Sequence, residues 1–92
     1  MPETRVRLVV SGLVQGVGFR YAARETAAAC GVAGWVRNLA DGSVEIVAQG
    51  ADDAVATMTA WAQSGPRHAS VARVVVDREE PEAGLTDFEI RR

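Results

Sequence analysis

The 92-residue sequence contains no lysine, one cysteine and one histidine, and only 5% of its residues are aromatic. A single cysteine cannot form an internal disulfide bond. Cys30 lies in an alanine-rich segment, where we expect it to pack as a small apolar side chain. His68 is expected to be a solvated loop residue. Because no cluster of Cys, His and Asp has the spacing of metal ligands, we expect no metal site.

Long apolar runs are also absent, since none approaches the roughly 20 residues of a membrane-spanning helix. The N-terminal segment lacks the apolar core and cleavage site of a secretory signal, so we expect a cytoplasmic protein without membrane association. Ten arginines stand against twelve acidic residues, and a net charge of −2 does not favour nucleic-acid binding. Arginine without lysine, beside abundant Ala, Val and Gly, indicates a GC-rich bacterial genome.

The length fits one domain, residues 1–92, and the small charged surface favours a monomer. Hydrophobic periodicity predicts the order strand, helix, strand, strand, helix, strand and a final extended segment or short strand. The expected strands are 5–11, 32–39, 43–50, 70–79 and 86–92, and the expected helices are 19–30 and 53–64, the second capped by Asp52. This order is typical of the α+β, ferredoxin-like βαββαβ sandwich, with an antiparallel sheet and both helices on one face.

The turn before the first helix holds Gly12, Gly16 and Gly18, and Arg20 follows directly. The first N–H groups of a helix have no internal partner, and glycines let the preceding backbone approach a ligand closely. Such amides can converge on one anion, and an arginine fork suits phosphate oxygens. The alternative interpretation is a tight turn that binds no ligand. The positive charge of Arg20 at the helix start favours a bound anion, because it is unfavourable there without one.

Nucleotide-binding motifs do not fit this turn. A Walker A loop has the pattern GxxxxGK[ST], and its second glycine stands five residues after the first, where this chain has Val17 after Gly12. A dinucleotide motif beginning at Gly16 fails because Tyr21 stands where its last glycine belongs. The sequence therefore predicts a site for one small phosphate group.

Two motifs give the chain a close resemblance to the acylphosphatase family. The first is Gly12-x-Val14-Gln15-Gly16-Val17-x-Phe19-Arg20, and the second is Gly34-Trp35-Val36-Arg37-Asn38. The resemblance implies a hydrolase that cleaves the carboxyl–phosphate bond of small acyl phosphates to a carboxylate and inorganic phosphate, without a metal or cofactor. It also implies that Arg20 binds the phosphate, that Asn38 positions the attacking water, and that the amides of the phosphate-binding loop contribute: Gln15, Gly16, Val17, Gly18, Phe19 and Arg20.

This chemistry needs few groups. A carboxylate leaves without help from a general acid, since its conjugate acid has a pKa of roughly 4 to 5. Phosphoryl transfer has a loose transition state, so the water needs positioning more than deprotonation. We therefore expect Arg20 and Asn38 to meet at one edge of the fold, and alkyl phosphate esters to be poor substrates.

Binding modules on the same fold are the alternatives. An RNA-binding domain of the RRM type needs exposed aromatics on its central strands, and 5–11 and 43–50 contain none. Small-molecule sensors and accessory domains of larger proteins also use this fold. Two further residues are undecided between structure and function: Trp35 packs or lines the site, and Arg37 is an exposed strand residue or steers anions.

Overall fold

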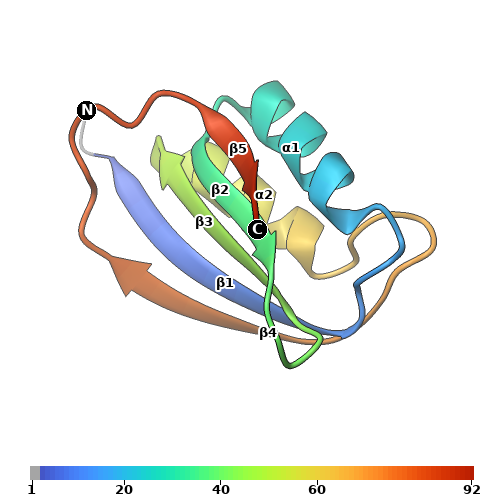
Figure 1. Cartoon of the computed structure of the whole chain (residues 1–92). Coiled ribbons are helices and arrows are strands. Elements are labelled where there is room, and N and C mark those ends of the chain that lie inside the picture. Colours follow the sequence, from blue (N-terminus) through green and yellow to red (C-terminus); the bar gives the residue numbers. More distant parts are fainter. Residues whose placement is uncertain (1–2) are drawn as a thin grey trace.

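The computed structural model describes residues 3–92, and its elements follow the expected order (Figure 1). They are β1 (Thr4–Leu13), α1 (Phe19–Cys30), β2 (Ala33–Asn38), β3 (Val44–Gly50), α2 (Asp52–Ala62), β4 (Ser70–Glu79) and β5 (Phe88–Arg91). No helix in these residues is long and apolar enough to cross a membrane.

The five strands form one sheet in the order β4-β1-β3-β2-β5. Neighbours pair antiparallel, except that β5 joins the free edge of β2 in parallel. The expected antiparallel sheet is therefore confirmed for four strands, and the fifth makes the sheet mixed. Both helices lie on the same face, where α1 packs on β2 and β5 and α2 packs on β1 and β3 (Figure 1). This confirms the ferredoxin-like sandwich.

The core fills the layer between the helices and the sheet. Its members come from alternate positions of the strands and from one stripe of each helix, and include Leu8, Val10, Phe19, Ala23, Ala27, Val36, Ile46, Val55, Met58 and Ala62. The rings of Phe19 and Trp61 lie 5.2 Å apart and link the starting turn of α1 to the end of α2. Phe19 is thus a buried packing residue, and it anchors the start of α1.

Two features of α2 differ from expectation. The prediction that Asp52 caps the helix is wrong, because Ala51 is the N-cap and Asp52 is already helical. β3 runs to Gly50, which leaves a single residue for the turn into α2. The Asp52 carboxylate instead accepts a hydrogen bond from the Thr4 hydroxyl. The helix also ends at Ala62, two residues earlier than expected.

Glu45 is buried on the outer sheet face, the face without helices, where its side chain is only 5% exposed. Arg7 and Arg37 each donate to its carboxylate at 2.7 Å, and the Trp35 indole donates at 3.3 Å. Burial by itself raises the pKa of Glu45, but the hydrogen bonds from Arg37, Arg7 and Trp35 outweigh it and hold the pKa below its ordinary value of 4.5. A group whose pKa is lower in the folded state stabilises that state above its unfolded-state pKa.

Replacing Glu45 by glutamine is therefore expected to lower the free energy of unfolding at pH 7, by about 2 kcal/mol for the lost charged hydrogen bonds. The difference from the wild-type protein should shrink as the pH falls below about 4.5, because the wild-type carboxyl then becomes protonated too. Urea unfolding at a series of pH values measures both quantities. A difference that stays constant down to pH 3 would contradict this account of Glu45.

Candidate active site

The turn between β1 and α1 has the backbone that the glycine pattern predicted. Gly16 and Gly18 have φ angles of 74° and 77°, in the left-handed region that glycine adopts most easily. Gly18 is the N-cap of α1, and no side chain caps that end of the helix. A Cβ placed on either glycine would meet nothing within 4 Å. The turn therefore presents open backbone next to a helix N-terminus.

Gly12 serves a different purpose from the other two glycines. β1 extends two residues further than expected, and its register against β4 shifts between Ser11 and Gly12. At Gly12 a Cβ would lie 2.3 Å from the Ser70 carbonyl oxygen. Close packing of two strands thus accounts for Gly12, and only Gly16 and Gly18 belong to the turn itself.

A cavity of about 90 Å³ lies at this turn. It is lined by Val14, Gly16, Gly18, Phe19, Arg20, Tyr21 and Asn38. The fold therefore brings Arg20, in the first turn of α1, to the same cavity as Asn38, the last residue of β2. Its volume is well below the roughly 300 Å³ at which pockets for drug-sized ligands begin, so it suits a small group.

The polar groups of Arg20 and Asn38 are available to a ligand. Within residues 3–92, neither side chain has a hydrogen-bond or ion-pair partner, since each side-chain contact in that range involves other residues. The first turn of α1 contains no acidic residue. The guanidinium and the positive end of the helix dipole thus act together without a competing carboxylate, which favours an anion.

Gln15 and Val17 do not line the cavity, although both belong to the predicted loop. Val17 packs against the core. The Gln15 side chain points to the turn after β2, where its amide nitrogen donates to the carbonyl oxygens of Leu39 at 2.8 Å and Ser43 at 2.9 Å. The expected role of these two residues through their backbone amides stays a prediction.

The turn that follows Asn38 is held by its own hydrogen bonds. The Leu39 N–H donates to the Ser43 carbonyl at 2.8 Å, and the Ser43 N–H donates to the Asp41 carboxylate at 3.0 Å. Hydrogen bonds from the Ser43 hydroxyl and N–H hold the pKa of Asp41 below its usual value. The β2–β3 turn is thereby a defined structure directly beside Asn38.

Tyr21 is a lining residue that the sequence reasoning missed. Tyr21 directly follows Arg20 in the chain, lines the cavity and is 60% exposed. The Arg24 guanidinium lies 5.5 Å from the centre of its ring. A tyrosine in the first turn of a helix carries no pattern of its own, so only the fold reveals its position.

The other candidates lie elsewhere. Trp35 does not line the cavity, and its ring instead packs against the guanidinium groups of Arg5, at 5.1 Å, and Arg91, at 4.0 Å. Arg37 is half exposed, and its guanidinium forms an ion pair with Glu45. His68 is an exposed loop residue, as expected. In the described part of the chain, no group of three His, Cys, Asp or Glu residues could hold a metal ion.

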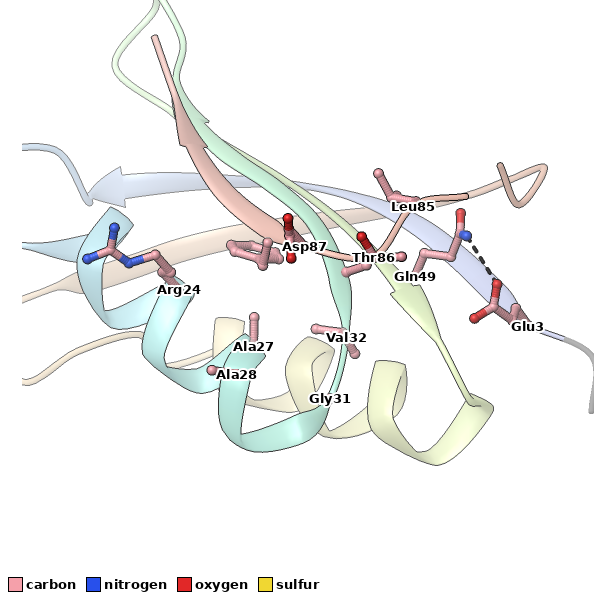
Figure 2. Close-up of a pocket in the computed structure, with 12 residues that line it drawn as sticks. Glu3, Arg24, Ala27, Ala28, Gly31, Val32, Gln49, Leu85, Thr86 and Asp87 are labelled. Carbon is pink, nitrogen blue, oxygen red and sulfur yellow. Dashed lines mark hydrogen bonds between the residues drawn. The ribbon is translucent and has the colours of Figure 1, made fainter. Parts of the chain in front are cut away.

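A larger cleft of about 380 Å³ lies along α1 and is lined by neither Arg20 nor Asn38. Figure 2 shows Arg24 at one end of it, on α1, and Glu3 with Gln49 at the other. Asp87 lies between these two ends. Because the cleft mixes charges of both signs, it lacks the anion preference of the cavity at the glycine turn.

Three comparisons with known proteins agree with one another. A family model described as acylphosphatase matches residues 6–90. An acylphosphatase of Trichormus variabilis is 53% identical over 88 residues, which cover 96% of this chain and 86% of that one. An acylphosphatase of Thermococcus kodakarensis is 48% identical over 90 residues, 98% of each chain. The crystal structure of acylphosphatase from Bacillus subtilis matches with a TM-score of 0.92 at 35% identity, over 97% of this chain and 99% of that one.

Proposed function

Since this chain belongs to the acylphosphatase family and is by that membership a hydrolase of acyl phosphates, we propose how its own residues carry out the reaction. In this proposal, Arg20 and the backbone amides from Gln15 to Arg20 bind the phosphate group of a small acyl phosphate. Asn38 orients the water that attacks it. The observation that carries the proposal is the single cavity lined by Gly16, Gly18, Arg20 and Asn38.

Phosphate binding follows from the charges at the turn. The transferred phosphoryl group spreads negative charge over three oxygens in the transition state. Arg20 offers a planar fork of N–H donors, and the exposed backbone before α1 offers further donors that need no rearrangement. Donors that are already fixed in place stabilise the charge of the transition state more than water molecules do, because water has to reorient first.

Hydrolysis then requires one oriented water molecule. The Asn38 amide can accept a hydrogen bond from that water through its oxygen or donate one to it through its nitrogen, which sets the water in line with the bond to be broken. The water oxygen bonds to phosphorus, and the bond from phosphorus to the acyl oxygen breaks with its electron pair on the carboxylate. The proton of the water passes to the phosphate or to solvent, and the products are a carboxylate and inorganic phosphate.

The substrate class follows from the cavity lining, in which the described residues include no His, Asp or Glu. A carboxylate leaves unprotonated, whereas an alkoxide does not. Since no step calls on a metal or another cofactor, the activity should persist in excess chelator. We further propose that the enzyme acts as a cytoplasmic monomer, in which Arg20, Asn38 and the loop amides of one chain suffice for the proposed reaction.

Hydrolysis of benzoyl phosphate by the wild-type enzyme in excess chelator tests this function. We expect rapid release of inorganic phosphate from benzoyl phosphate and no measurable release from an alkyl phosphate at the same concentration. Equal rates on both compounds, or loss of activity in chelator that added metal restores, would contradict the proposal. No activity at all, with phosphate still protecting the protein from unfolding, would instead indicate an anion-binding module.

A further inference from the structure

We infer that Gln15 is a positioning residue for this hydrolysis. Its side chain fixes the β2–β3 turn, which follows Asn38, relative to the turn between β1 and α1, residues 14–18, here called the anion-binding turn. The inference rests on the proposed function, but it assigns to Gln15 a role that its backbone amide does not have. It concerns the distance between two halves of the cavity and not a contact with the substrate.

The two halves of the cavity come from strands that are not neighbours in the sheet. The anion-binding turn follows β1, whereas Asn38 ends β2, and β3 lies between these strands. No backbone ladder between β1 and β2 therefore sets the separation of Arg20 and Asn38. Gln15 supplies a direct polar link between the turn after β1 and the turn after β2.

The Gln15 amide nitrogen has no N–H left to donate to a substrate. A glutamine Nε2 carries two hydrogens. Both are used, because Nε2 donates to the carbonyl oxygens of Leu39 and Ser43. These carbonyls also accept the N–H groups of Gly42 and Leu39, at 3.2 and 2.8 Å, so each has two donors. Gln15 thus completes the hydrogen bonding of the β2–β3 turn at both of its ends.

The link acts over a short length of chain. Gln15 lies between Val14 and Gly16, which both line the cavity, and Leu39 directly follows Asn38. A shift of the β2–β3 turn away from Gln15 would therefore displace Asn38 relative to the bound phosphate. A displacement of about 1 Å in a positioning group can lower a rate by about 10²-fold.

Gln15→Met tests the inference, because methionine keeps the length of the side chain and removes both donors. Gln49→Met is the matched control. The Gln49 amide also makes buried hydrogen bonds, to the Glu82 backbone at 2.8 Å and to Glu3 at 3.2 Å, and Figure 2 shows its contact with Glu3. Gln49 pairs with Ala33, at the opposite end of β2 from Asn38.

We expect Gln15→Met to lower kcat for benzoyl phosphate by 10- to 100-fold, with KM changed less than threefold, because the groups that bind phosphate stay on α1 and its turn. Gln49→Met should leave kcat within twofold, although both variants lose stability. The milder Gln15→Asn, whose amide is too short to reach both carbonyls, should lower kcat at least fivefold and keeps the test usable if the methionine variant does not fold.

A double-mutant cycle with Asn38→Ala separates positioning from general stability. If Gln15 acts through Asn38, the double variant Gln15→Met/Asn38→Ala should be no slower than Asn38→Ala alone. Independent multiplication of the two effects, or a Gln15→Met enzyme as active as wild type, would overturn the inference and leave the proposed function intact. An inactive wild-type enzyme would overturn both.

Discussion

Arg20→Ala is expected to lower kcat/KM for benzoyl phosphate by about 10³-fold, the lower end of what a transition-state arginine contributes in phosphoryl transfer. Among the described residues that line the cavity, Arg20 alone carries a formal charge. Its removal leaves no charged side chain among the described lining residues to hold a group with two negative charges, so binding then depends on the amides and the helix dipole. Binding of inorganic phosphate should weaken in parallel, and both effects can be measured by steady-state kinetics and by calorimetric titration.

Arg24→Ala is the matched control for Arg20. Arg24 is one turn further along α1, exposed, and outside the lining of the cavity. Its replacement removes the same charge from the same helix and should change kcat/KM less than threefold. Arg20→Lys keeps the charge but loses the planar fork, so it should recover only part of the activity. If Arg24→Ala were as damaging as Arg20→Ala, the effect would be one of general charge, and the assignment of Arg20 would be wrong.

Asn38→Ala is expected to lower kcat by about 10² to 10³-fold and to change the Kd of inorganic phosphate less than threefold. The separation follows from the proposed division of labour, in which the α1 side binds phosphate and Asn38 positions water. An interaction made only in the transition state lowers kcat and kcat/KM together when it is removed. Initial rates over a range of substrate concentrations, together with phosphate titration, measure both quantities.

Asn38→Asp distinguishes positioning from general-base catalysis. Aspartate has nearly the shape of asparagine, but its carboxylate cannot donate a hydrogen bond and repels the phosphate. We therefore expect it to be no more active than Asn38→Ala. If Asn38→Asp were more active than wild type at neutral pH, the water would need deprotonation more than orientation, and the role assigned to Asn38 would fail.

The sequence predicted those parts of the fold that local signals mark. The bounds of α1 and β4 are confirmed, because glycines stand at both ends of α1 and the loop before β4 contains Gly65 and Pro66. The parallel pairing of β5 with β2 could not be read from the sequence, since the last strand has no local signal for its partner. Long-range pairing decides that feature.

The candidate site was predictable to a similar degree. The resemblance named Arg20 and Asn38, and the fold places both at one cavity, yet no spacing could show it, because 18 residues separate them in the chain. Gly12 illustrates the limit of such prediction. The glycine pattern assigned it to the predicted phosphate-binding turn, but its close approach to the Ser70 carbonyl shows that it serves strand packing. The Gln15 side-chain contacts, 24 and 28 residues away, were equally invisible.

Hydrolysis of benzoyl phosphate in water enriched in ¹⁸O tests the central claim most directly. If a water held by Asn38 attacks the phosphorus bound by Arg20, a single turnover should place the label in inorganic phosphate and leave benzoate unlabelled. Mass spectrometry of both products reads the result. Label in benzoate would mean that water attacks the carbonyl carbon, and the assignment of the cavity as a phosphoryl-transfer site would be wrong.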